Sequence, residues 1–262
     1  MDVEHKDQNG ELAERLQKVL AQAGVASRRQ VERLIEEGRV TVNGITVSVL
    51  GTKVNSNDTI CVDGTLIERS ERLFYYLLNK PMGVITSARD PQGRPTVVEI
   101  MRDAPARVYP VGRLDFDTSG LLVMTNDGEL AHRLMHPSYG VEKTYRVWVH
   151  GPVGIKALEQ LREGVLLNDG KTAPAKVVRR SGLLKRRIVD QMSEPLEVLE
   201  ITIHEGKNRQ VRRMFGAIGY PVAKLERIAF GPLAQDGQLQ SGSYRSLTRE
   251  EIKKLRSLVG LT

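Results

Sequence analysis

Cysteine is almost absent from this sequence of 262 residues, which contains only Cys61. A single cysteine excludes a disulfide within the chain and a zinc site built from clustered cysteines. Histidine is also scarce, at five residues, and His132, His136 and His150 lack partners at the spacing of a metal site. We therefore expect neither a disulfide framework nor a bound metal.

Long apolar runs are absent as well. No stretch approaches the roughly 20 residues that a membrane-spanning helix requires. The first residues, MDVEHKDQNG, are polar and lack the apolar region of a signal peptide. The sequence contains neither a GxxxxGK[ST] phosphate loop nor a GxGxxG fingerprint. We expect a cytoplasmic protein that contacts no membrane and needs no small-molecule cofactor.

Acidic residues are outnumbered by basic ones. The chain has 39 lysines and arginines against 32 aspartates and glutamates, a formal net charge of +7. This excess favours a polyanionic partner such as nucleic acid, although many proteins are mildly basic without one. The distribution is more informative, because six basic residues and one acidic residue, Glu226, lie between Lys207 and Arg227.

Apolar spacing and turn residues divide the chain into a small and a larger domain. Ser27 is a good N-cap for a helix, and Asn43-Gly44 between alternating apolar residues predicts a hairpin. The larger part mixes strand and helix patterns, so we expect an α+β fold with a mostly antiparallel sheet. The expected segments are a disordered terminus (1–11), a helix-helix-hairpin domain (12–67), a linker (68–73) and the α+β domain (74–262).

Within the larger domain, apolar runs and helical spacing predict individual elements. The expected strands are 73–81, 108–111, 120–125, 143–150 and 196–204. The expected helices are 128–135, 154–164, 208–218 and 248–259. The polar stretch 169–195, which includes the basic run Lys185–Arg187, is expected to be a hairpin or a long loop.

Basic side chains gather in the small domain, on its helices and near its hairpin. Cations on one helix face beside a hairpin suit contacts with RNA phosphates. A solvated helix face is the alternative, because three glutamates lie among the arginines at helix-pair spacing. The candidate RNA-binding residues are Lys18, Arg28, Arg29, Arg33, Arg39 and Asn43.

One stretch of the small domain, RLQKVLAQAGVASRRQVERLIEEGRVTVNG, resembles the S4 RNA-binding domain. The resemblance extends from Arg15 to about Gly64 and includes the double arginine and the GRVTVNG exit. It implies that the small domain binds structured RNA.

A second stretch, VGRLDFDTSGLLVMTND, places Arg113 and Asp115 two residues apart, just before an apolar run. Residues two apart on a strand share one face, so a cation and a carboxylate would point the same way. Such a pair is either a salt-bridged turn or a catalytic carboxylate with a neighbouring cation.

Four polar stretches lie at the edges of apolar segments, where active-site residues gather: LNKPMGVITSARD, GRLDFDTSGLL, HPSYGVEKTYRV and HEGKNRQVRRMF. Together they resemble the pseudouridine synthases of the bacterial ribosomal type, from Leu77 to Leu233, and the large-subunit type more closely than the small-subunit type. The resemblance implies that a uridine of folded ribosomal RNA is isomerised. The bond between ribose C1′ and uracil N1 breaks, and the base rejoins through C5 without a cofactor.

The resemblance also implies roles for individual residues. Asp115 is the catalytic carboxylate, and Asp117 is a turn or helix-cap residue. Arg212, at a position that is basic in the family, is expected to pair with Asp115 and keep it ionised. Arg113 is expected to fill the gap left by the flipped uridine, and Tyr145 to stack on the uracil.

Further cations are expected to contact RNA phosphates. Lys207, Arg209 and Arg213 lie beside Arg212, and a solvated helix face is the alternative for these three. Lys80, which precedes Pro81, is expected to line the cleft and hold a phosphate, and an ordinary strand end is its alternative.

We therefore expect a monomeric enzyme that acts on large-subunit ribosomal RNA. The alternatives are the same reaction on small-subunit or transfer RNA, or a ribosome assembly factor that binds ribosomal RNA without catalysis. The joint presence of Asp115, Tyr145 and Arg212 favours catalysis, because a purely binding protein would be free to lose any of them.

Overall fold

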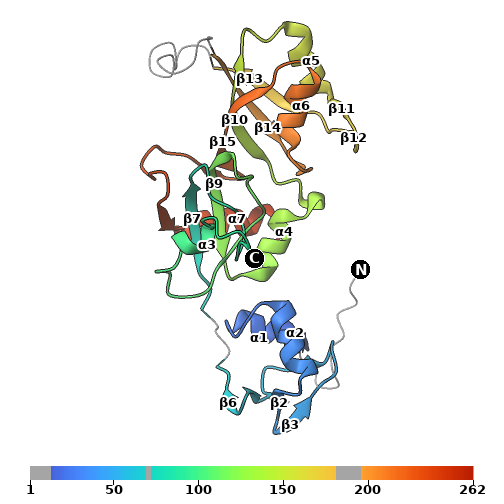
Figure 1. Cartoon of the computed structure of the whole chain (residues 1–262), viewed down its shortest axis with the longest axis vertical. Coiled ribbons are helices and arrows are strands. Elements are labelled where there is room, and N and C mark those ends of the chain that lie inside the picture. Colours follow the sequence, from blue (N-terminus) through green and yellow to red (C-terminus); the bar gives the residue numbers. More distant parts are fainter. Residues whose placement is uncertain (1–12, 69–71, 181–195, 262) are drawn as a thin grey trace. The chain divides into compact units, whose positions relative to one another are not determined.

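A computed structural model describes residues 13–68, 72–180 and 196–261 of the chain (Figure 1). The chain forms two compact units, which divide between Leu73 and Phe74. Three expectations fall wholly or partly outside the described residues: the disorder of 1–11, the middle of the linker 68–73 and the basic run Lys185–Arg187.

The first unit is a helix pair on a small sheet. Its sheet has the strand order β3-β2-β5-β6, and β1 pairs with β4. Asn43 and Gly44 both have positive φ angles, 52° and 80°, which a two-residue hairpin turn requires. The elements are β1 (Glu14–Arg15), α1 (Leu16–Gln22), α2 (Arg28–Glu36), β2 (Val40–Val42), β3 (Ile45–Val47), β4 (Lys53–Val54), β5 (Ile60–Val62) and β6 (Thr65–Leu66).

Helix α2 begins as its sequence predicts. The Ser27 side chain accepts a hydrogen bond from the backbone of Gln30, whose side chain accepts one from the backbone of Ser27. This reciprocal capping box satisfies two N–H groups that a helix leaves unpaired. The apolar face of the helix, with Val31 and Ile35 fully buried, packs against α1 and the sheet.

The second unit is built on a nine-stranded sheet. Its main path runs β13-β14-β10-β15-β9-β7-β17, with β16 beside β15 and β8 beside β9. All of its strand pairs are antiparallel except β15 with β9. The strands are β7 (Tyr75–Lys80), β8 (Tyr109–Pro110), β9 (Thr118–Thr125), β10 (Lys143–His150), β13 (Lys176–Arg179), β14 (Leu196–Ile203), β15 (Val222–Phe230), β16 (Leu233–Ala234) and β17 (Tyr244–Ser246), with a separate hairpin of β11 (Leu166–Leu167) and β12 (Gly170–Lys171).

Helices cover the two halves of this sheet separately (Figure 1). Helices α5 and α6 pack on the half that contains β10 and β14, and α4 and α7 pack on the half that contains β7 and β9. Among the described residues, no helix is both long and apolar enough to span a membrane. The helices are α3 (Val97–Ile100), α4 (Gly128–Met135), the 3₁₀ turn η1 (Pro137–Tyr139), α5 (Ile155–Glu163), α6 (Gln210–Ala217) and α7 (Arg249–Leu258).

The α+β prediction is confirmed, and the four predicted helices of the larger domain lie within two residues of their expected bounds. The stretch 169–195 contains β12 and β13, and 181–195 lies outside the described residues. The prediction omits β15, because its apolar residues are interrupted by Lys224, Glu226 and Arg227. This omitted strand lies in the middle of the sheet and joins its two halves.

The two halves meet where β15 runs parallel to β9, with Arg227 opposite Gly120. Gly120 has a φ angle of +111°, and a Cβ at this position would lie 2.2 Å from the carbonyl oxygen of Arg227. Only glycine combines this backbone conformation with so close an approach of another strand. Gly120 is therefore required for the pairing of β9 and β15.

Replacing Gly120 with alanine should lower the free energy of unfolding of the second unit by about 3 kcal/mol or more, because overpacking adds to backbone strain. Urea denaturation measures this loss. Gly237→Ala is the matched control, because Gly237 also has positive φ, +80°, but its Cβ would meet nothing within 4 Å. It should cost only about 1–2 kcal/mol. Equal losses in the two variants would contradict the role of the close approach.

Candidate active site

A pocket of about 560 Å³ lies in the second unit where the two halves of the sheet meet. Its walls come from the loop before β9, from β10, from β15 and from the segment that leads into α6. Of the residues predicted to form the site, the pocket is lined by Arg113, Asp115, Tyr145, Lys207 and Arg209. The pocket thus brings together side chains that are up to 96 positions apart in the sequence (209 minus 113).

Asp115 is held at the pocket by backbone contacts on both sides. The backbone N–H and carbonyl of the buried Leu114 bond to the Thr86 hydroxyl at 3.2 and 2.7 Å. The Asp115 carbonyl accepts from Thr118 N–H at 3.0 Å. The Asp115 side chain itself is 34% exposed. A carboxylate is therefore presented to the pocket by a fixed loop.

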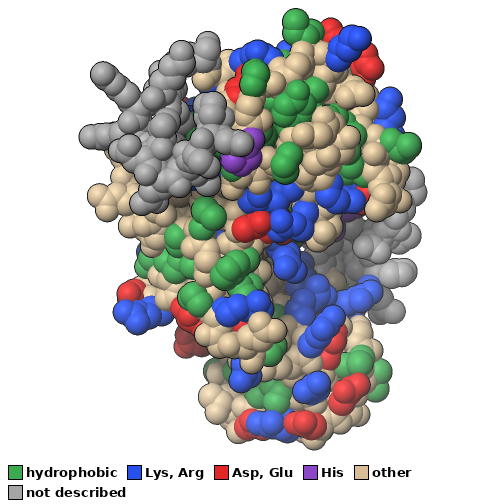
Figure 2. Space-filling model, turned by 45° about the horizontal axis from the view of Figure 1, so that its top comes forward, with side chains coloured by type: hydrophobic (Ala, Val, Ile, Leu, Met, Phe, Trp, Pro, Cys, Tyr) green, Lys and Arg blue, Asp and Glu red, His purple; other side chains and the backbone are tan. Residues whose placement is uncertain are grey.

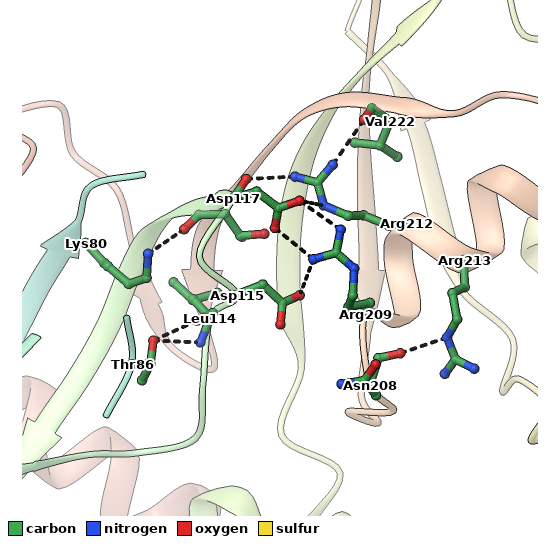
Figure 3. Close-up of polar contacts among 11 residues, drawn as sticks. Lys80, Thr86, Leu114, Asp115, Asp117, Asn208, Arg209, Arg212, Arg213 and Val222 are labelled. Carbon is green, nitrogen blue, oxygen red and sulfur yellow. Dashed lines mark hydrogen bonds and ion pairs between the residues drawn. The ribbon is translucent and has the colours of Figure 1, made fainter. Parts of the chain in front are cut away.

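The predicted pairing of Asp115 with Arg212 does not form. Arg212 instead contacts Asp117: its Nε lies 3.1 Å from Oδ2, and its Nη2 donates to the Asp117 carbonyl at 2.7 Å (Figure 3). The Arg212 Nη1 also donates to the Val222 carbonyl at 3.0 Å. These contacts hold Arg212 on Asp117, whereas the cation nearest to Asp115 is Arg209, at 3.8 Å.

Asp117 lies in a turn, as expected, and its carboxylate also anchors two arginines. Arg209 donates two hydrogen bonds to the Asp117 carboxylate, at 3.0 and 2.8 Å, and Arg212 contacts the same carboxylate. These hydrogen bonds outweigh partial burial and lower the pKa of the Asp117 carboxyl below its usual value. Arg209 adopts a left-handed backbone conformation, with φ of 45°, directly before α6. Asp117 thus fixes the start of α6 against the start of β9.

Tyr145 and Arg113 lie where their predicted roles require. Tyr145 is partly buried on β10, opposite Arg227 of β15, and lines the pocket. Arg113 is exposed and lines the same pocket. Stacking by Tyr145 and insertion of Arg113 into RNA remain predictions that this arrangement permits.

Two cations predicted to contact phosphates also have partners within the chain. The Lys207 ammonium donates to the carbonyls of Asp169, Gly170 and Lys171 at 3.2–3.3 Å. Arg213 binds the Asp169 carboxylate through two hydrogen bonds of 2.9 Å. Both side chains attach the start of α6 to the β11–β12 hairpin, which offers a carboxylate and backbone carbonyls.

Lys80 is not available to a phosphate. Its side chain is completely buried, and its ammonium donates to the carbonyls of Pro81 and Thr118 at 2.8 and 2.9 Å. Burial lowers the pKa of Lys80 to about 8, although Asp115 and Asp117 oppose the change. The predicted phosphate contact is therefore wrong, and Lys80 instead holds the end of β7 to the start of β9 (Figure 3).

The predicted RNA-binding residues of the first unit fall into two groups. Arg39 binds Asp63 through hydrogen bonds of 2.8 and 2.5 Å, Lys18 pairs with Glu14, and the Asn43 amide bridges Asp58 and Thr59. Three arginines of α2 are exposed, and no ion pair of theirs is found among the described residues: Arg28, Arg29 and Arg33. These three are the best placed of the group to contact a polyanion, whereas the others form internal contacts.

Sequence reasoning missed two lysine or arginine side chains that line the pocket, Lys143 and Arg227. Lys143 lies on β10 two residues before Tyr145, so strand alternation places both on one face. Arg227 lies on β15 and is 2% exposed. A charged residue within an apolar strand was the available signal for Arg227. Among the described residues, no three His, Cys, Asp or Glu side chains converge on a metal site.

The surface also has the charge expected of a protein that binds a polyanion. Lysine and arginine side chains are numerous on the face drawn in Figure 2, where they alternate in places with acidic ones. The pocket itself combines a partly exposed carboxylate, an aromatic ring and several cations. Such a set can hold an aromatic base and a sugar close to a nucleophile or general base.

Comparisons with known proteins point to one family. Residues 74–217 match the family described as RNA pseudouridylate synthase, and residues 14–60 match the S4 domain. The chain is 50% identical to ribosomal large subunit pseudouridine synthase B of Bacillus subtilis, over 94% of this chain and 96% of that protein. It is 43% identical to ribosomal large subunit pseudouridine synthase B of Pseudomonas aeruginosa, over 95% of this chain and 64% of that protein.

A solved structure gives the same indication. The crystal structure of a pseudouridylate synthase superposes with a TM-score of 0.63 and 34% sequence identity. The superposition covers 92% of this chain and 99% of the other.

The burial of Lys80 has a measurable consequence for stability. Between about pH 8 and 10.5, the unfolded chain binds a proton at this lysine that the folded chain does not. The contribution of Lys80 to the free energy of unfolding therefore rises with pH in this range. The free energy of unfolding of the wild type minus that of Lys80→Met should rise by about 2–3 kcal/mol from pH 8 to 10.5. A constant difference, measured by urea denaturation across this range, would mean that Lys80 titrates normally.

Proposed function

Because the chain belongs to the RNA pseudouridine synthase family and contains an S4 domain, we propose that it converts a uridine of large-subunit ribosomal RNA to pseudouridine. The names of the relatives from Bacillus subtilis and Pseudomonas aeruginosa support the large-subunit target. The observation that carries the assignment of the reacting group is the presentation of Asp115 to the pocket by a fixed loop. We also propose that the protein acts as a monomer in the cytoplasm.

The reaction is an isomerisation, so nothing is added to or removed from the RNA overall. The C1′–N1 bond breaks, the base turns, and C5 bonds to C1′ while C5 loses its proton and N1 gains one. A carboxylate can serve this reaction by attacking the sugar, by attacking the base or by removing the 2′ proton. In our proposal, Asp115 performs one of these steps.

The other pocket residues prepare the uridine for this step. In our proposal, Tyr145 stacks on the uracil and Arg113 occupies its place in the RNA stack. Arg209 lies 3.8 Å from Asp115, and Arg212 is held by Asp117, two residues further along the same loop. Asp117 therefore supports the reaction indirectly, by placing two guanidinium groups.

The first unit supplies RNA affinity through α2. Its three exposed arginines, Arg28, Arg29 and Arg33, can each neutralise a phosphate and release counterions. We propose that this unit docks on the folded RNA while the second unit performs the chemistry.

Asp115→Asn should abolish turnover yet leave RNA affinity within a few-fold, because one neutral pocket side chain adds no phosphate contact. Pseudouridine mapping of all ribosomal RNA, in cells that lack the protein and carry either version, tests this. One large-subunit site should be lost and restored only by the wild type. A lost site in small-subunit RNA would contradict the target, and restoration by Asp115→Asn would contradict the role of Asp115. No lost site at all would favour an assembly factor.

Replacing Arg28, Arg29 and Arg33 with glutamine should weaken RNA binding and reduce its salt dependence. The slope of log K against log salt should fall by about 2–3, at roughly 0.9 for each phosphate contact. Filter binding at several salt concentrations measures the slope. Arg39→Gln is the control and should change it little, because Arg39 is engaged by Asp63. Equal effects of the single and triple variants would show that α2 is not the docking surface.

A further inference from the structure

Arg227 lies at the centre of the sheet, on the strand that joins its two halves. Its neighbour on β10 is Tyr145, and its neighbour on β9 is Gly120. Between the pairs Thr144–Ala229 and Tyr145–Arg227 the register shifts, so that Ile228 is an extra residue on β15. Such bulges redirect a neighbouring side chain and are common beside active sites. Arg227 is therefore placed at the pocket wall by a local irregularity of the strand.

The contacts of Arg227 leave part of its guanidinium without a partner. Nε donates to the Leu121 carbonyl at 2.7 Å, and the guanidinium carbon lies 5.1 Å from the centre of the Phe230 ring. Among the described residues, Nη2 has no hydrogen-bond partner and no carboxylate forms an ion pair with Arg227. Arg227 is 2% exposed, so Nη2 is withdrawn from bulk solvent. A buried guanidinium N–H without an acceptor is costly, and a ligand in the pocket that Arg227 lines could supply the acceptor.

The surroundings of Arg227 carry excess positive charge. Lys143 lines the same pocket, and among the described residues its ammonium donates to two carbonyls, of Val141 at 2.9 Å and His204 at 3.4 Å. The pKa of Lys143 is lowered to about 8 by burial and, secondarily, by the charge of Arg227. The charge of Arg227 also lowers the pKa of Lys80. Arg227 and Lys143 thus line a pocket to which Asp115 is presented, an arrangement suited to stabilise a second negative charge.

We propose that Arg227 donates hydrogen bonds to a carbonyl oxygen of the detached uracil and stabilises its negative charge. This inference rests on the proposed function. When the C1′–N1 bond breaks, both bonding electrons stay on the uracil, and its charge spreads from N1 to the adjacent carbonyl oxygens. The electron-deficient C1′ is captured by Asp115, or the 2′ proton is removed. An electron pair of the uracil then forms the C5–C1′ bond, while the Asp115 carboxylate leaves C1′ or a proton returns to C2′. Finally C5 loses its proton and N1 gains one.

The position of Arg227 favours the base over a phosphate as the acceptor. Arg227 is opposite Tyr145, the residue proposed to stack on the uracil, and both line the pocket. A phosphate carries several strongly hydrated oxygens and suits an exposed cation such as Arg113. A donor that is 2% exposed instead suits a planar base that has left solvent.

The test compares two RNA substrates, one with uridine and one with 5-fluorouridine at the target position. Fluorine makes the departing uracil anion intrinsically more stable, so it needs less help from the protein. Arg227→Met should slow single-turnover consumption of uridine by at least about 100-fold, the usual effect of removing one such donor. It should slow consumption of 5-fluorouridine by about tenfold or less. RNA affinity should stay within about threefold of wild type.

A control variant tests whether the loss of any arginine from the sheet has the same effect. Arg146 follows Tyr145 on β10, pairs with Glu200 at 3.3 Å and does not line the pocket. Arg146→Met should react with both RNAs within about threefold of the wild type. Circular dichroism and thermal unfolding show whether each variant is folded. If Arg227→Met is unfolded, Arg227→Lys, which keeps the cation but loses the planar pair of donors, is tested with the same two RNAs.

The outcomes are distinct. An equal loss on both RNAs would overturn the proposal, because it would mean that Arg227 only holds β9 through Leu121. A loss below threefold on uridine would overturn it as well, while leaving the proposed function intact. A wild-type chain that consumed neither RNA would overturn the proposed function and this inference with it. A larger loss on uridine than on 5-fluorouridine would support the proposal.

Discussion

The close approach of β9 and β15 at Gly120 is the constraint on which the rest of the second unit depends. It creates the only parallel strand pair among the described strands of the large sheet and joins a half covered by α5 and α6 to a half covered by α4 and α7. Asp115 precedes β9, and Arg209, directly before α6, belongs to the other half. Asp115 and Arg209 line one pocket because these two strands pair.

The two aspartates at this junction, Asp115 and Asp117, differ in how closely arginines contact them. Asp117 binds Arg209 and Arg212 and has a lowered pKa, so it stays ionised and holds both guanidinium groups in place. Asp115, two residues earlier, is left with a single contact to Arg209 at 3.8 Å. A reactive carboxylate needs cations near it but not bonded tightly to it, because a bidentate pair would occupy both of its oxygens.

Many cations of this chain serve the fold rather than RNA. Lys80, Lys207 and Arg213 each bond to carbonyls or a carboxylate within the second unit, and Arg39 does so in the first. Net charge therefore overstates the surface available to phosphates. The exposed arginines of α2 are the better candidates for contact with the RNA backbone. The unpartnered Nη2 of Arg227 is the better candidate for contact with the base.

The amino-acid sequence by itself determined what depends on neighbouring residues: the capping box at Ser27, the hairpin turn at Asn43-Gly44, four helices of the larger domain and the loop that carries Asp115. Caps, turns and periodic faces are set by contacts within a few positions, so they can be predicted from a short stretch. Only the tertiary structure decided that Arg212 binds Asp117, that Lys80 is buried and that Arg227 reaches the pocket. Arg212 and Asp117 are 95 positions apart, and no local pattern reports which distant side chains meet. The bulge at Ile228 and the close approach at Gly120 bring β9, β10 and β15 together. They decide these contacts, because they set distances between side chains that the sequence pattern leaves open.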